Sequence, residues 1–351
     1  MQYKLLNIRQ FPYSCILVGM IFSFFNVGLA HAAPEIQGVE GQLRSGQEIT
    51  VKGTGFSEVS SLSIVKDSAD KALVNDHGRL ELTETGLSAW HNNEHTQWST
   101  PLAPIVDKSD SGTVYKGVGR SYNQYLGSFP NNSTRSLFVS WDYKPSHHPA
   151  HSAGSNKFIR IWDQYSGQET RISWTQMHMI YSDATGETKP TWGGWPGTPG
   201  EWNQMEVWVD SDSGRITASV NGRIVHDVND FSKVPNGIGL NIRIIGFDPS
   251  VGDPYREMET MLDNIYVSTE KARIVISADE EWENAKGNNT VQVPLEWSST
   301  EITFKLDPER LDVEKPHYLY VIDKDGSANS IGYRLCAACP GAPPSSSIVV
   351  E

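Results

Sequence analysis

The feature that most constrains the fold is the stretch over residues 200–225, in which apolar and polar residues alternate with a period of two. Such alternation puts one apolar row on one face of a β-strand. The apolar row here consists of Met205, Val207 and Val209. An Asp/Ser/Gly cluster at 210–214 and an Asn-Gly pair at 221–222 follow, and both are typical of hairpin turns. The stretch therefore predicts three consecutive antiparallel strands, each with one face on a core and one face open to solvent or ligand.

The start of the chain predicts an export signal. Lys4 and Arg9 give a basic beginning, an apolar run follows over 15–27, and small residues stand at Ala30 and Ala32. Because the run is short for a membrane span, we expect cleavage after Ala32 and no membrane insertion afterwards. We therefore expect a secreted, periplasmic or cell-surface protein, with an uncleaved anchor as the alternative.

The charge of the chain limits its partners. The 351 residues carry a formal net charge of -13, and loss of Lys4 and Arg9 with the signal makes it more negative. An acidic protein is poorly suited to phosphate backbones and anionic lipid, so we expect no nucleic-acid partner.

The end of the chain carries little functional information. Cys336 and Cys339 form a Cys-Ala-Ala-Cys pair, for which we expect a small local disulfide or exposed thiols rather than a redox or zinc site. The proline- and serine-rich residues after them complete a predicted flexible tail over 336–351.

Strand patterns at the two ends of the chain predict one domain in two pieces. Near the start, Ile49 and Val51 alternate with polar residues before the turn Gly-Thr-Gly-Phe. This opening resembles the IPT/TIG family of immunoglobulin-like domains. Strand-like runs similar to the later strands of that family lie at 272–276, 291–294, 301–306 and 318–322. We therefore predict a discontinuous immunoglobulin-like domain over 33–66 and 268–335, with two independent small domains as the alternative.

The inserted residues 67–267 contain many short strand patterns, Gly/Pro/Asn/Ser turns and no sustained helical period. This pattern predicts an all-β, two-sheet sandwich. The segments SLFVSW, GEWN, ASVNG and LDNIYV, at 136–141, 200–203, 218–222 and 262–267, resemble the concanavalin A-like (laminin-G-like) jelly-roll superfamily. That resemblance implies a sugar site on the concave sheet.

Strand alternation predicts which side chains line the concave sheet. The predicted outward rows are Arg160 and Trp162; Trp174, Gln176 and His178; Glu206 and Trp208; and Asn241 and Arg243. Aromatic plates with polar groups between them suit a sugar polymer. The alternative is that these are ordinary outer-face residues, some of them packed under loops.

Two further segments are candidates for binding. Trp192 and Trp195, in a Gly/Pro loop, form either a ligand platform at the sheet's edge or a plug over the core. The histidines at 147, 148 and 151 favour a solvated loop over a metal site. We expect no cofactor; Ca²⁺ is possible at 210–214, where a plain hairpin turn is the favoured interpretation.

Two reactions on a polysaccharide are compatible with a sugar-binding sheet: glycoside hydrolysis and β-elimination. Glycoside hydrolysis is disfavoured, because Glu206 and Asp210 share a row but lie about 13 Å apart, beyond the roughly 5 to 9.5 Å that the mechanism uses. Polysaccharide β-elimination requires a base near a sugar proton and polar groups at the uronate carboxylate. His178 as base, with Gln176 and Arg160 or Arg243, meets that requirement.

We therefore predict first a protein that binds a polysaccharide or cell-surface glycan. A polysaccharide lyase acting on a uronate-containing polymer is the second hypothesis, and a structural adhesion protein is the third.

Overall fold

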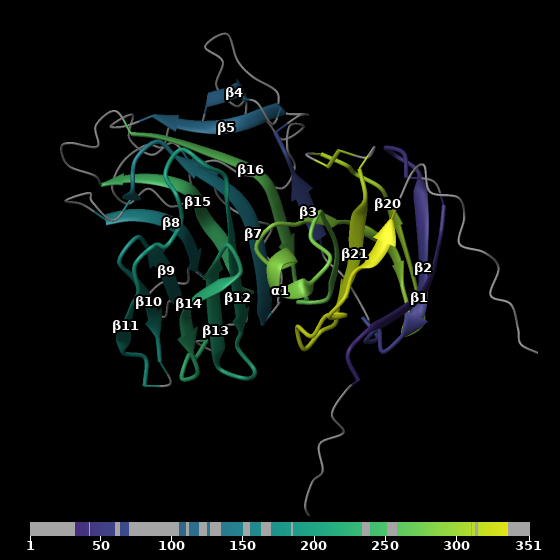
Figure 1. Cartoon of the computed structure of the whole chain (residues 1–351). Helices are drawn as coiled ribbons and strands as arrows, with labels where there is room; N and C mark the ends of the chain where they lie inside the picture. Colours follow the sequence, from purple (N-terminus) through teal and green to yellow (C-terminus); the bar gives the residue numbers. More distant parts are fainter. Residues whose placement is uncertain are drawn as a thin grey trace, which may run out of the picture. The chain divides into compact units, whose positions relative to one another are not determined.

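The structure, a computed structural model, describes residues 32–41, 43–59, 64–69, 105–109, 112–118, 125–126, 135–149, 155–162, 170–183, 185–233, 239–250, 258–309, 311–312 and 315–335. Antiparallel strands dominate these stretches, which confirms the predicted all-β class (Figure 1). The helix α1 (Trp282–Ala285) is a single turn. No helix within the described stretches is long and apolar enough to cross a membrane. The expected export signal, Cys336, Cys339 and the expected tail fall outside them.

Two large sheets make the larger of two sandwiches. In spatial order, the six-stranded sheet contains β11 (Thr188–Trp192), β10 (His178–Ser182), β9 (Arg171–Thr175), β8 (Ser155–Trp162), β15 (Asn241–Ser250) and β6 (Tyr125–Leu126). The eight-stranded sheet contains β14 (Arg223–Val228), β13 (Arg215–Val220), β12 (Asn203–Asp210), β7 (Ser136–Pro145), β16 (Glu259–Ser268), β5 (Gly112–Val118) and β4 (Ile105–Ser109), with β3 (Ile64–Asp67) also paired to β16. Apolar residues from both sheets, among them Trp141, Ile161 and Val207, form one buried core.

The central hairpins have the predicted form. β12 pairs with β13 and β13 with β14, all antiparallel. Met205, Val207 and Val209 are fully buried. Asn221 and Gly222 have positive φ values of 49° and 73°, as a tight hairpin turn between twisted strands requires.

Two four-stranded sheets make the smaller sandwich. The N-terminal one contains β1 (Glu35–Glu40), β2 (Glu48–Thr54), β20 (Glu301–Lys305) and β19 (Pro294–Trp297). The C-terminal one contains β18 (Thr290–Gln292), β17 (Arg273–Ser277), β21 (His317–Ile322) and β22 (Tyr333–Leu335). Val51 is the Cα partner of Ile302, so strands from opposite ends of the chain share one sheet. Ile49 and Phe304 join Ile274 in the common core.

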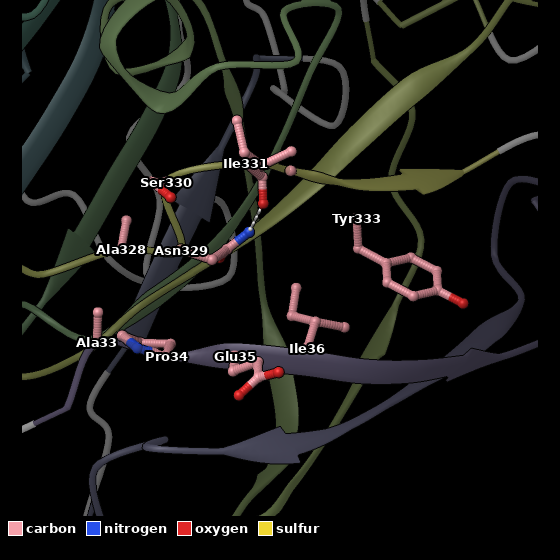
Figure 2. A pocket seen from close by; sticks show the side chains of 10 residues that line it. Ala33, Pro34, Glu35, Ile36, Ala328, Asn329, Ser330, Ile331 and Tyr333 are labelled. Carbon is pink, nitrogen blue, oxygen red and sulfur yellow. Dashed lines mark hydrogen bonds between the residues drawn. The ribbon is translucent and has the colours of Figure 1, made fainter.

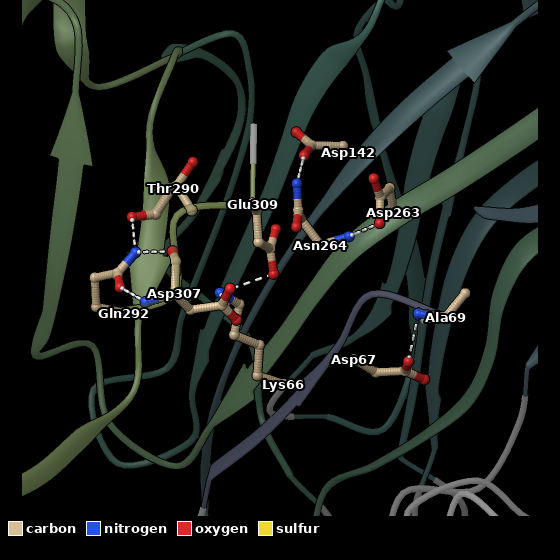
Figure 3. Close-up of polar contacts among 10 residues, drawn as sticks. All are labelled: Lys66, Asp67, Ala69, Asp142, Asp263, Asn264, Thr290, Gln292, Asp307 and Glu309. Atoms are coloured by element: carbon tan, nitrogen blue, oxygen red, sulfur yellow. Dashed lines mark hydrogen bonds and ion pairs between the residues drawn. The ribbon is translucent and has the colours of Figure 1, made fainter. Parts of the chain in front are cut away.

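The larger and smaller sandwiches share a buried junction. Phe138 and Tyr266, on the outer face of the eight-stranded sheet, pack with Val275 and Tyr320 of the C-terminal four-stranded sheet. Figure 3 shows polar contacts nearby, in which Lys66 Nζ lies 2.9 Å from Glu309 Oε1. Because β3 pairs with β16, the expected domain boundary at residue 66 falls within a strand of the larger sandwich. The outer face of the eight-stranded sheet is therefore covered by protein at β7 and β16.

Candidate functional site

Two residues predicted to bind a ligand, Glu206 and Trp208, lie on β12 of the eight-stranded sheet. Both point away from the core of the larger sandwich, but they point toward the smaller one. Glu206 Oε1 lies 3.3 Å from Arg273 Nη2, and Trp208 packs against the junction cluster. Their predicted place on the sugar face is therefore wrong, because β12 lies in the opposite sheet from β8, β9 and β10 and protein covers its outer side.

The outer face of the six-stranded sheet carries one row of side chains across four neighbouring strands. Lys157 on β8 is the Cα partner of Thr175 on β9, and His178 on β10 is the Cα partner of Trp192 on β11. A tight turn at 176–177 brings Thr175 beside His178. Residues that alternate with this row, such as Met179, are buried in the core. The row therefore faces outward and ends at the edge strand β11.

His178 and Trp192 form the exposed end of this row. Their ring centroids are 5.0 Å apart, with 48° between the ring planes. Thr175 Oγ1 lies 3.3 Å from His178 Nδ1 and donates to the His178 carbonyl oxygen at 2.9 Å, which fixes the histidine at the turn. Burial and the nearby Lys157 lower the pKa of His178. The imidazole is therefore neutral at pH 7, and it stands beside an indole that is 68% exposed.

The exposed apolar surface continues from Trp192 to the neighbouring turn. Met177 is 41% exposed, and its carbonyl oxygen accepts a hydrogen bond from Gly193 N at 3.0 Å. A Cβ on Gly193 would meet Val225 O at 2.9 Å, so the loop after β11 lies against β14. We call the surface formed by Met177, His178 and Trp192 the Trp192 edge. It combines an open aromatic ring, a flexible thioether and a neutral imidazole.

His226 lies beneath this edge, in the core. It is 1% exposed, and its ring centroid is 6.1 Å from that of Trp174. Within the described residues neither of its ring nitrogens has a hydrogen-bond partner. Burial, and to a smaller extent His178, lowers the pKa of His226 to about 4.

This buried histidine makes the stability of the protein pH-dependent. Between its unfolded pKa of 6.5 and its folded pKa of about 4, the folded state binds fewer protons, so stability is lost as the pH falls. Between pH 7 and pH 4, His226 should lower the free energy of unfolding of the wild type by about 3 kcal/mol. We expect His226→Phe to lack this part of the pH dependence. Urea unfolding at the two pH values measures it, with His147→Phe at an exposed position as control. An unchanged pH dependence in His226→Phe would contradict the prediction.

Arg160 and Asn241 face outward as predicted, but they are closed to a ligand. Arg160 is 3% exposed, and its Cα partners are Ser173 and Ile244. Asn241 is fully buried and donates through Nδ2 to the Gly239 carbonyl oxygen at 2.7 Å. Direct contact of either side chain with a sugar is therefore excluded in this state. The predicted site residues Trp162 and Arg243 lie on β8 and β15, but the structure does not describe their side chains.

Trp174 and Gln176 do not share a row with His178. Trp174 lies in the core, with ring centroids 5.9 Å from Trp141 and 5.5 Å from Phe158. Gln176 is fully buried in the turn between β9 and β10. The prediction that these two line the ligand face is therefore wrong, because the period of two does not continue through a turn that reverses the chain.

The two tryptophans of the Gly/Pro loop have different roles. Trp195 is 3% exposed, and its Nε1–H donates to Met205 Sδ at 3.4 Å. The ring of His148 packs on it at 5.2 Å. Trp195 is therefore the plug, and its predicted ligand contact is wrong; Trp192 is the open platform.

The acidic side chains at 210–214, the possible Ca²⁺ position, are engaged in local contacts. Asp210 Oδ1 accepts from Asp212 N at 2.9 Å, and Arg135 Nε lies 2.5 Å from Asp212 Oδ1. Across the described stretches no group of three or more His, Cys, Asp or Glu side chains is placed to hold a metal ion. His151 falls outside the described residues.

A cavity of about 370 Å³ lies at the start of β1 and before β22 (Figure 2). Residues 33–36 and 328–333 line it. Among these lining residues Glu35 alone is charged, and Asn329 Nδ2 is engaged with the Ile331 carbonyl oxygen at 2.8 Å. The cavity therefore offers few groups for chemistry.

Comparison with known proteins gives distant likenesses. No protein-family model matches this chain, and no curated protein matches it. A structure of alginate lyase Aly36B is 11% identical with a TM-score of 0.36, covering 58% of this chain and 96% of that one. Domain 4 of AbnA, a GH43 extracellular arabinanase from Geobacillus stearothermophilus, in complex with arabinotriose, is 13% identical with a TM-score of 0.33, covering 68% and 93%. The cellulose-induced protein Cip1 is 16% identical with a TM-score of 0.33, covering 50% and 88%. Likenesses this distant carry no argument about this chain.

Sequence reasoning missed three residues of this region. Thr175 positions His178, Met177 extends the apolar surface, and His226 lies below it. A Thr followed three residues later by His, across a two-residue turn, is a local hydrogen-bonding pattern that points to Thr175. His226 gives no such indication, because its depth depends on the packing of β14 against the loop after β11.

Proposed function

We propose that this protein is an exported carbohydrate-binding protein that holds a polysaccharide against the Trp192 edge. The observation that carries the proposal is the Trp192 indole, 68% exposed on an edge strand with the His178 ring 5.0 Å away. A flat apolar ring beside a hydrogen-bonding group suits the apolar face and the hydroxyls of a sugar.

The rest of the fold supports a site at the edge rather than across a whole sheet. The outer face of the eight-stranded sheet contacts the smaller sandwich. On the six-stranded sheet, Arg160 and Asn241 are buried. We propose that the larger sandwich is a concanavalin A-like jelly roll. In this proposal the smaller one is a discontinuous IPT/TIG-like domain that presents it at the cell surface or in the surrounding medium.

Replacing Trp192 by alanine tests the proposal. A panel of alginate, pectate, glucuronan, glycosaminoglycans and cello-oligosaccharides identifies the polymer that the wild type binds. Because covering a large apolar side chain is worth about 1.5–3 kcal/mol, we expect Trp192→Ala to weaken binding roughly tenfold to hundredfold. Leu295→Ala, at a residue 53% exposed on β19, is the matched control and should bind as the wild type does. Equal affinity in Trp192→Ala, or no binding to any polymer, would contradict the proposal.

The second candidate function is polysaccharide β-elimination. It is favoured by the lowered pKa of His178, since a neutral imidazole is able to accept a sugar proton at pH 7. The burial of Arg160 and Gln176 disfavours it, because both were expected at the uronate carboxylate. A lyase raises ultraviolet absorbance on the uronate polymers of the panel, and His178→Ala abolishes the rise. Binding without any such rise supports the first proposal; a purely adhesive protein gives neither result.

A further inference from the structure

His226, beneath the Trp192 edge, is buried in a place that suits only its neutral form. The ring is 1% exposed, and among the described residues neither of its nitrogens has a hydrogen-bond partner. A protonated imidazole carries a positive charge and two donors. Burying that charge without an acceptor is far more costly than burying the neutral ring. Protonation of His226 therefore favours any state of the protein in which the ring reaches water.

The elements packed against His226 offer nothing that would stabilise its charged form. On β9, the Trp174 ring stands at 87° to the imidazole, with the centroids 6.1 Å apart. On β13, the Cα partner of His226 is Ala218. On β10, His178 carries a charge of the same sign when it is protonated, and it lowers the pKa of His226 further.

The charged side chains of β14 itself are directed to solvent. Asp227, the next residue along the strand, is exposed, and its Oδ2 lies 3.0 Å from Arg215 Nη2. Arg223, at the start of the strand, is also exposed. In the described part of the chain, no carboxylate acts on the pKa of His226.

The segment Gly193-Gly194 lies over His226. A Cβ on Gly193 would be 3.1 Å from His226 Cε1 and 2.9 Å from the Val225 carbonyl oxygen, so the backbone rests directly on these two residues. A Cβ on Gly194 would have nothing within 4 Å, so that position is open. Two consecutive glycines give a backbone wide conformational freedom. This segment is therefore the cover that is easiest to move.

The same segment holds the Trp192 edge together. Gly193 N donates to the Met177 carbonyl oxygen at 3.0 Å, and Trp192 directly precedes it. On the other side of the segment, Trp195 is 3% exposed and donates to Met205 Sδ. Lifting the two glycines therefore breaks the bond to Met177 and displaces Trp192, while Trp195 stays in the core.

We propose that His226 is a proton-operated latch: when it takes up a proton, the Gly193-Gly194 segment lifts, the Trp192 edge comes apart and the polysaccharide is released. The release rests on the proposed function, whereas the movement does not. The coupling is reciprocal, so a polysaccharide that holds the edge closed also keeps His226 neutral. The site therefore binds at neutral pH and releases its ligand in acid.

Hydrogen exchange of the Gly193 amide, without polysaccharide, tests the movement. The pKa of His226 is about 4 when the segment covers it and 6.5 as the ordinary value in water. Opening should therefore become about twentyfold more favourable between pH 7 and pH 5, and protection of Gly193 should fall by that factor. The control is the Gly186 amide in the β10–β11 turn, which donates to the Asp183 carbonyl oxygen, also at 3.0 Å, and should keep its protection.

His226→Phe keeps an aromatic ring in the core but takes up no proton. We expect the protection of Gly193 in this variant to be the same at pH 7 and pH 5. A fall that persists in His226→Phe would assign the response to His178 and overturn the latch. Constant protection of Gly193 in the wild type would overturn it as well.

Two alanine substitutions test the cover without titration, and they serve if His226→Phe does not fold. Gly193→Ala forces the segment away from Val225 and His226 at pH 7. It should expose the neighbouring amides to exchange and weaken polysaccharide binding about tenfold. Gly194→Ala is the matched control, because its Cβ enters open space, and it should behave as the wild type does. Identical behaviour of the two variants would overturn the proposal.

Polysaccharide affinity at pH 7 and pH 4.5 tests the release and separates it from the proposed function. The wild type should bind at least about threefold more weakly at pH 4.5, which corresponds to an open form twice as abundant as the closed one. His226→Phe should match the wild type at pH 7 and lose less affinity at pH 4.5. Binding with the same pH dependence in both proteins would overturn the release and leave the proposed function intact. No binding to any polymer at pH 7 would overturn the proposed function and the release together, while the exchange of Gly193 still decides the movement.

Discussion

Replacing Glu206 by alanine should destabilise the protein by about 3–5 kcal/mol and leave glycan binding unchanged. The Glu206 and Arg273 side chains are 15% and 5% exposed, and their charged atoms are 3.3 Å apart across the junction. The Arg273 guanidinium also stands 4.3 Å from the centroid of the Phe138 ring. Removing the carboxylate leaves the buried Arg273 guanidinium without its counter-charge. This uncompensated charge is the reason for the large expected loss of stability.

Urea unfolding at pH 7 measures this effect, and Asp212→Ala is its matched control. The pair of Asp212 with Arg135 is open to solvent, with side chains 72% and 48% exposed, so its loss should cost at most about 1 kcal/mol. Glu206→Ala with unchanged stability and weakened glycan binding would restore the original prediction that Glu206 lines the sugar site.

A disulfide between residues 50 and 303 should form readily and stabilise the protein by up to about 5 kcal/mol. Thr50 and Thr303 are Cα partners on β2 and β20, and their hydroxyl oxygens are 3.5 Å apart. The positions are 253 residues apart in sequence, so the cross-link closes a very long loop in the unfolded chain. The double variant Thr50→Cys/Thr303→Cys is made with Cys336 and Cys339 replaced by serine.

Non-reducing electrophoresis and urea unfolding with and without reductant report the cross-link. The two single-cysteine variants are controls and should show no reductant-sensitive stability. Failure of the double variant to oxidise would contradict the pairing of β2 with β20. It would therefore also contradict a smaller sandwich built from both ends of the chain.

Local pattern was enough to predict the strands and their buried faces. The alternation of Met205, Val207 and Val209 places three side chains in the core, and Asn221-Gly222 makes the predicted turn. Such features depend on neighbours two to four residues away, so the sequence shows them directly.

The composition of the site could not be predicted in the same way. Alternation places Glu206 and Arg160 correctly on outward faces, but it does not tell which sheet each strand joins or what covers that sheet. β8 contains a register shift between Lys157 and Ile159, and a turn separates Trp174 from His178. Trp192 and Trp195 are three residues apart, yet one is 68% exposed and the other 3%. Burial of this kind is decided by contacts between segments distant in sequence.

Hydrogen exchange of backbone amides, measured with and without the polysaccharide that the wild type binds best, tests the central claim most directly. We expect added protection at β10, β11 and the turn at 176–177, and we expect it to disappear in Trp192→Ala. Protection confined to the smaller sandwich, or none at β10 and β11 under saturating polysaccharide, would contradict a binding site at the Trp192 edge.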